Sequence, residues 1–162
     1  MKDTTFGFIG LGLIGGSIAK GIKRTCPDAR IMAYMRTRAK LEQAKADGIV
    51  DVILDGIGEP LRECDIIFLC TPVEYNAQYL TQIRPFLKPG ALISDVGSTK
   101  EDIHCVVTSL GMEDVFVVYS CNGSYDGSRH DDRMFLQAAG DYRSSNRGRD
   151  HSRGDNHSRD RS

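Results

Sequence analysis

TFGFIGLGLIGGSIAK, residues 5–20, is the stretch around which the rest of the chain is arranged. Its apolar start, Phe6–Ile9, is typical of a buried strand. Three glycines follow at G-x-G-x-x-G spacing, namely Gly10, Gly12 and Gly15. Isoleucines at helical spacing come next, so the pattern predicts a strand, a tight turn and a helix in that order.

Each glycine of this turn would have its own role in binding a dinucleotide. Gly10 would make the turn out of the strand, Gly12 would let the backbone approach a diphosphate, and Gly15 would let the helix pack on the sheet. The free backbone N–H groups at the start of the helix, at the positive end of its dipole, would face the phosphates. The alternative is a glycine-rich turn without a ligand. The strand–turn–helix context favours dinucleotide binding.

Short apolar runs alternate with amphipathic segments along the chain. We expect strands at Arg30–Met35, Ile49–Leu54, Ile66–Cys70, Ala91–Val96 and Val115–Tyr119, and helices at Thr37–Asp47, Ile57–Glu63, Glu74–Arg84 and Lys100–Leu110. The run IIFLC is continuously apolar, which indicates a strand that is covered on both faces, as in a parallel sheet. The order therefore predicts an α/β fold of the Rossmann type, with a doubly wound, mostly parallel sheet.

The composition of the chain changes at about Cys121. Residues 141–162 contain no aliphatic side chain and are rich in Arg, Ser, Asp and Gly. We expect a dinucleotide-binding domain over residues 1–120 and an irregular or disordered polar tail over residues 121–162. An RNA-binding arginine–serine tail is the alternative, although interspersed aspartates cancel much of its charge.

Overall composition excludes several classes of protein. The chain has 162 residues and a formal net charge of −1, which gives no bulk attraction to nucleic acid or to an anionic membrane. No apolar stretch is as long as a membrane span, and the N-terminus lacks a signal-peptide core. The five cysteines are scattered without a disulfide or metal-binding spacing. We expect a cytoplasmic protein without a metal site.

The end of the second expected strand bears on the choice of cofactor. An NAD site normally has Asp or Glu here to bind the ribose 2′-hydroxyl. In this chain Arg36 and Thr37 follow the strand instead. An arginine offers a planar set of donors to a 2′-phosphate, so we predict a preference for NADP, with NAD possible. The alternative is a solvated basic start to the next helix.

Three segments, GLGLIGGSIAKGI, DIIFLCTPV and LISDVGSTK, together resemble the prephenate/arogenate dehydrogenase family of tyrosine biosynthesis. The likeness runs from about Phe6 to Val117. It implies an oxidoreductase that transfers hydride from the substrate ring to NAD(P) while carbon dioxide leaves and the ring becomes aromatic. It also implies a small-molecule partner, prephenate or arogenate, and a dimeric enzyme.

The resemblance assigns diphosphate binding to the glycine turn together with the backbone of Leu13 and Ile14, and it assigns roles to two further segments. Cys70, Thr71 and Pro72 would wall the nicotinamide, the alternative being a strand end with a proline stop. Ser98 corresponds to the family's active-site serine, which lies beside nicotinamide and substrate. Ser98 could instead, or in addition, cap the helix that begins near Lys100.

Two departures from the family bear on activity. Ser120 stands where the family has its catalytic histidine, and nothing after residue 121 could build the family's helical dimerisation domain. We therefore expect a chain that is truncated or frameshifted after about Val117, and that binds cofactor without turning over substrate. The alternative is genuine divergence to a non-catalytic NADP-binding module whose tail is an interaction segment.

Overall fold

One parallel sheet organises the part of the chain that the structure, a computed structural model, describes, which is residues 4–96 and 101–117. Within these residues the sheet has six strands: β1 (Thr5–Ile9), β2 (Arg30–Tyr34), β3 (Val52–Ile53), β4 (Ile66–Leu69), β5 (Leu92–Asp95) and β6 (Phe116–Val117). Their order is β3-β2-β1-β4-β5-β6, and each neighbouring pair is parallel. The predicted Rossmann-type, doubly wound α/β fold is confirmed.

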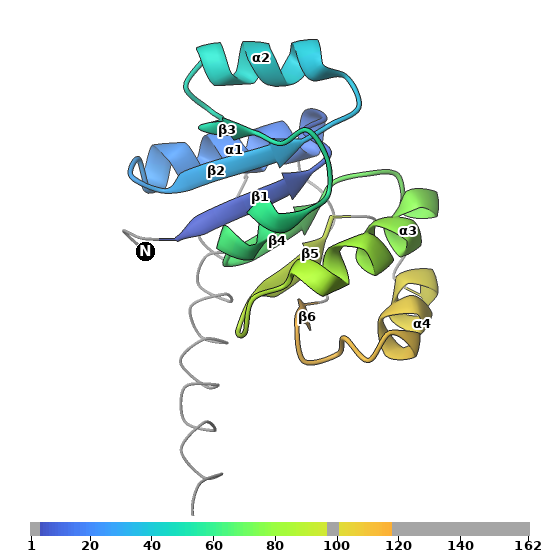
Figure 1. The fold of residues 1–162 in the computed structure, drawn as a ribbon. Coiled ribbons are helices and arrows are strands. Elements are labelled where there is room, and N and C mark those ends of the chain that lie inside the picture. Colours follow the sequence, from blue (N-terminus) through green and yellow to red (C-terminus); the bar gives the residue numbers. More distant parts are fainter. Residues whose placement is uncertain (1–3, 97–100, 118–162) are drawn as a thin grey trace, which may run out of the picture. The chain divides into compact units, whose positions relative to one another are not determined.

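The helices connect these strands across both faces of the sheet. They are α1 (Leu13–Thr25), α2 (Arg38–Ala46), α3 (Val73–Ile83) and α4 (Glu101–Ser109), with 3₁₀ helices η1 (Glu59–Glu63) and η2 (Arg84–Phe86). Figure 1 shows α1 behind the sheet and α3 in front of it. Among the helices in the described part of the chain, none combines the length and apolarity that a bilayer crossing requires.

Two segments differ from the sequence-based expectation. The third strand was expected over Ile49–Leu54, but only Val52 and Ile53 pair with β2. The backbone N–H groups of Ile49 and Val50 instead donate to the carbonyl of Ala44, at 2.9 and 3.2 Å, and so complete the end of α2. The helix expected over Ile57–Glu63 is the shorter η1.

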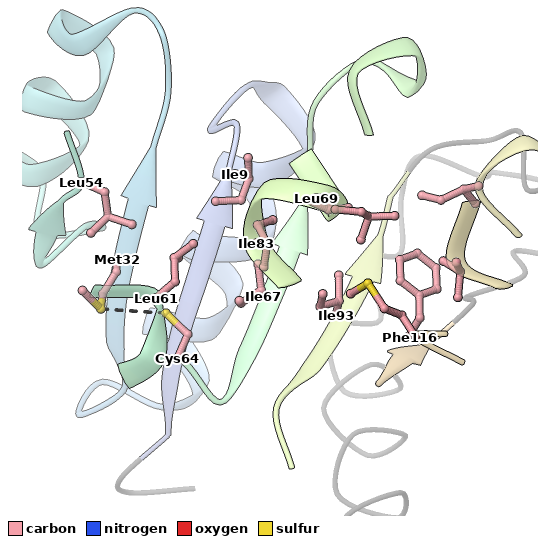
Figure 2. Close-up of a cluster of buried hydrophobic side chains, with 14 residues drawn as sticks. Ile9, Met32, Leu54, Leu61, Cys64, Ile67, Leu69, Ile83, Ile93 and Phe116 are labelled. Carbon is pink, nitrogen blue, oxygen red and sulfur yellow. Dashed lines mark hydrogen bonds between the residues drawn. The ribbon is translucent and has the colours of Figure 1, made fainter. Parts of the chain in front are cut away.

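The core on the α3 side of the sheet supports the strand ends that carry the candidate site. Figure 2 shows this cluster, in which side chains of the central strands pack against η1 and the neighbouring helices. Its fully buried members include Ile9, Leu61, Cys64, Ile67, Leu69, Leu80, Ile83 and Ile93. The continuous burial of β4 agrees with the continuous apolar run that the sequence shows there.

The strand order places β1 beside β4, although α1 and two further strands separate them along the chain. The connections leave β1 and β4 toward opposite edges of the sheet. In open α/β sheets, ligands bind outside the carboxyl ends of the strands at such a switch point. The segments that follow β1 and β4 are therefore where a ligand site is expected.

Candidate dinucleotide-binding site

The turn after β1 requires glycine at position 10. Gly10 has φ of +89°, a conformation that side chains with a Cβ rarely adopt. A Cβ on Gly10 would lie 2.8 Å from the carbonyl oxygen of Cys70. The Gly10 N–H donates to the carbonyl of Tyr34 at 2.8 Å, which ties the turn to the end of β2. The backbone thus turns sharply between two neighbouring strand ends.

The other two glycines of the motif have contrasting surroundings. A Cβ on Gly15 would lie 2.7 Å from the Gly10 carbonyl oxygen and 3.1 Å from the Cys70 sulfur, so α1 packs closely on the turn. A Cβ on Gly12 would meet no atom within 4 Å. Gly15 therefore serves the packing of the helix, whereas the space in front of Gly12 is open to a ligand.

The start of α1 fits an anion. Gly12 is its N-cap and provides no side-chain hydrogen bond, and the first turn contains no acidic residue. The first N–H groups of a helix have no partner within the helix, and its dipole makes this end positive. Leu13 and Ile14 are 89% and 54% exposed, so their side chains leave the helix end accessible. The residues present fit a diphosphate group.

The segment after β4 lies directly beside the glycine turn. The Cys70 N–H donates to the carbonyl of Ile9 at 2.8 Å, which joins the ends of β4 and β1. Burial, with a smaller contribution from the charge of Asp95, raises the pKa of the Cys70 thiol to about 12. Cys70 is therefore protonated at neutral pH and acts as a packing residue under the turn, not as a nucleophile.

A buried polar chain links the end of β4 to the end of β5, and the sequence analysis missed it. The Thr71 hydroxyl donates to Asn76 Oδ1 at 2.7 Å, and Asn76 Nδ2 donates to Asp95 Oδ1 at 2.8 Å. Asn76 and Asp95 are each 1% exposed. One signal was available, because Asn76 lies at helical spacing from Leu80 and Ile83 and so places an amide on the apolar side of α3. Pro72, the N-cap of α3, is exposed.

Two arginines that follow β2 differ in their partners: Arg36 lies over an aromatic ring, whereas Arg38 forms ion pairs. The Arg36 guanidinium lies over the ring of Tyr75, 5.2 Å from its centroid. Arg38 instead pairs with Asp55 and Glu42, and both raise its pKa. Thr37 is the N-cap of α2, but its hydroxyl makes no capping hydrogen bond. Arg36 and Thr37 therefore both keep polar groups that α2 does not use.

Tyrosines surround Arg36 on the side of α3. The rings of Tyr34 and Tyr79 meet edge to face, with their centroids 6.3 Å apart. Burial raises the pKa of Tyr79, and the nearby Arg36 charge opposes this shift. Together with Tyr75, these residues form what we call the tyrosine cluster (Tyr34, Tyr75 and Tyr79). It joins the end of β2 to α3.

The structure therefore brings two predicted groups together, the glycine turn and the segment Cys70–Pro72. Arg36 and Thr37 lie at the next strand end, which the Gly10–Tyr34 hydrogen bond connects to the turn. Ser98, its alternative role as a helix cap, and the tail with Ser120 all lie outside the described residues. The same is true of the predicted domain boundary near residue 120.

A family model decides the relationship of the chain. The model described as "Prephenate dehydrogenase, nucleotide-binding domain" matches residues 18–119. The chain belongs to the prephenate dehydrogenase family. The match begins inside α1, so the glycine turn lies just before the matched residues.

Individual relatives support membership of the prephenate dehydrogenase family. The chain is 43% identical over 96 residues to a prephenate dehydrogenase of Lactococcus lactis, which covers 59% of this chain and 27% of the relative. It is 36% identical over 95 residues to a cyclohexadienyl dehydrogenase of Zymomonas mobilis, covering 59% and 32%. The chain thus spans about a third or less of the length of these curated relatives.

Solved structures of the family share the fold. Arogenate dehydrogenase of Synechocystis matches with a TM-score of 0.60 and 32% identity, over 66% of this chain and 37% of that one. Prephenate dehydrogenase of A. aeolicus, in complex with hydroxyphenyl propionate and NAD+, matches with a TM-score of 0.67 and 18% identity, over 86% and 57%. The second likeness is evidence for the fold alone.

Proposed function

We propose that this chain binds NADP, and that in a complete enzyme it holds the hydride acceptor for the oxidative decarboxylation of prephenate or arogenate. The observation that carries the proposal is the glycine turn at the switch point, with open space before Gly12, in a chain of this family. The names of the relatives support the reaction, and the NAD+ in the A. aeolicus complex supports a nicotinamide cofactor.

Each part of the site would have a distinct role toward the cofactor. The start of α1 would bind the diphosphate through backbone N–H groups, and Cys70, Thr71 and Pro72 would contact the nicotinamide half. The bound nicotinamide supplies the hydride acceptor. The protein would contribute by holding donor and acceptor in line and by excluding competing orientations.

The preference for NADP over NAD rests on Arg36. This guanidinium is exposed and makes no ion pair with any residue in the described ranges, while its ring contact with Tyr75 limits its freedom. A 2′-phosphate would gain charge-assisted hydrogen bonds from it. Thr37 offers a further donor from its uncommitted hydroxyl.

Arg36→Ala is expected to weaken NADP binding by about 10- to 100-fold, the loss that follows removal of hydrogen bonds to a charged group. NAD affinity should not change, because NAD lacks the 2′-phosphate. Titration calorimetry with both cofactors measures the two affinities. Arg38→Ala is the matched control and should leave NADP affinity near that of the parent, since Asp55 and Glu42 engage this guanidinium. Equal affinity of the parent for NAD and NADP would refute the preference.

The alternative function, a non-catalytic NADP-binding module, has no support among the relatives, which are named as dehydrogenases. The two functions differ in one assay. Under the alternative, no protein that contains residues 1–117 would reduce NADP in the presence of prephenate or arogenate, even when the remainder of an enzyme is supplied.

Ser98 is our proposed active-site residue, on the strength of its motif. The test uses a chimera that joins residues 1–117 to the C-terminal part of the Lactococcus lactis prephenate dehydrogenase, so that turnover is measurable. Ser98→Ala should lower kcat and leave NADP affinity and the melting temperature nearly unchanged. A loss of about 1 kcal/mol in stability without a change in kcat would show that Ser98 only caps a helix.

A further inference from the structure

Asn76 is a buried amide that the proposed cofactor contacts do not use. It is 1% exposed, on the first turns of α3, and it hydrogen-bonds on both sides. Of its two partners, Thr71 follows β4 and Asp95 is the last residue of the neighbouring strand β5. Asn76 therefore connects two strand ends at the edge of the sheet where the ligand site is expected.

The orientation of the Asn76 amide follows from the chemistry of its partners. A carboxylate can only accept hydrogen bonds, so the group that faces Asp95 must be the NH₂ group. The amide oxygen is then directed at the Thr71 hydroxyl, which donates to it at 2.7 Å. Because both bonds are buried or partly buried, each partner loses more if the amide is removed than a solvated group would.

The Thr71 side chain, which Asn76 orients, lies beside the glycine turn. With its hydroxyl bonded to Asn76, its methyl group Cγ2 lies 3.0 Å from the position that a Cβ on Gly10 would occupy. Two hydrogen bonds therefore connect Asp95 through Asn76 to Thr71, and the Thr71 methyl group lies beside the turn at Gly10. These residues extend from the end of β5 to the end of β1.

We propose that Asn76 is a positioning residue for the nicotinamide half of the site. It fixes the Thr71 side chain relative to the end of β5 and does not touch the cofactor itself. The inference rests on the proposed function, because it assumes that the segment after β4 contacts the nicotinamide. Arg36 and the end of β2 would hold the adenosine half, and Asn76 contacts neither of them through its two hydrogen bonds.

The test compares two ligands, NADP and 2′,5′-ADP, which has the adenosine and the 2′-phosphate but lacks the nicotinamide half. In Asn76→Asp, a carboxyl oxygen replaces the NH₂ group that faces Asp95. The hydrogen bond from Asn76 Nδ2 to Asp95 is then lost, while the size of the side chain stays nearly constant. NADP affinity should fall by about tenfold, which corresponds to the loss of one such interaction, and 2′,5′-ADP affinity should stay within about twofold. Calorimetry gives both values, and thermal melting confirms folding.

A second variant protects the test against misfolding of Asn76→Asp. Thr71→Val keeps the shape of the side chain at a half-buried position and removes only the hydroxyl, so it should show the same selective loss. Thr81→Val is the matched control on α3, because its hydroxyl bonds only to the Ala77 carbonyl at 3.0 Å on an exposed face. Its affinities for both ligands should equal those of the parent.

The outcomes separate the inference from the proposed function. Equal weakening of both ligands by Asn76→Asp and Thr71→Val would overturn the positioning role, because it indicates general loss of structure. Unchanged affinity for both ligands in the two folded variants would overturn it as well. A parent chain that binds neither NADP nor 2′,5′-ADP would overturn the proposed function, and the inference with it.

Discussion

Gly10→Ala is expected to lower the free energy of unfolding by about 2–5 kcal/mol. A left-handed backbone costs a residue with a Cβ about 1–2 kcal/mol, and Gly10 has φ of +89°. Overpacking costs about 1–3 kcal/mol more, and the new Cβ would lie 2.8 Å from a backbone oxygen that cannot rotate away. The melting temperature, followed by circular dichroism, should fall by several degrees for each kcal/mol lost.

The same substitution at Gly16 is the control and should act in the opposite direction. Gly16 lies inside α1, and a Cβ there would meet no atom within 4 Å. Alanine is favoured over glycine in a helix by about 0.5–1 kcal/mol, so Gly16→Ala should be at least as stable as the parent. Parental stability of Gly10→Ala would contradict the turn geometry.

Gly12→Val should greatly weaken cofactor binding and leave the fold intact. The space that its side chain would fill is empty of protein atoms within 4 Å of the Cβ, and the backbone at Gly12 is extended, with φ of −76° and ψ of −156°. A diphosphate that approaches the start of α1 would meet this side chain instead of backbone. We expect a loss of NADP affinity on the order of 100-fold, measured by calorimetry.

Stability and binding are measured together for Gly12→Val. Its free energy of unfolding, obtained from thermal melting, should lie within about 1 kcal/mol of the parent's, the range for replacing a glycine N-cap. Gly16→Ala should bind NADP as the parent does. Full NADP affinity of a folded Gly12→Val protein would show that the diphosphate does not approach this turn, and would remove the main support for the proposed function.

Local patterns were sufficient to predict the sheet and the turn. Glycine spacing and continuous apolar runs act within a few residues, so they located β1, α1 and β4 closely. The expected third strand was too long, because the backbone N–H groups of Ile49 and Val50 bond to the end of α2 and not to β2. The apolar pattern of the sequence does not distinguish between these two hydrogen-bonding partners.

Contacts between distant elements could not be predicted in the same way. Asn76 meets Asp95 only because the sheet order places β5 beside β4, and Arg36 meets Tyr75 because β2 ends and α3 begins at the same edge of the sheet. The amide on the apolar side of α3 was visible in the sequence, but its partners depended on the topology. The position of the glycine turn was thus predictable, whereas the hydrogen bonds around the candidate site required the structure.

The tyrosine cluster gives the chain an optical property. The protein contains six tyrosines and no tryptophan, so its intrinsic emission comes from tyrosine alone. Three of these emitters, Tyr34, Tyr75 and Tyr79, lie around Arg36. A nucleotide that displaces the Arg36 guanidinium from the Tyr75 ring would alter the surroundings of a fluorophore directly. We therefore expect the tyrosine emission of unlabelled protein to change when a nucleotide binds at this end of the site.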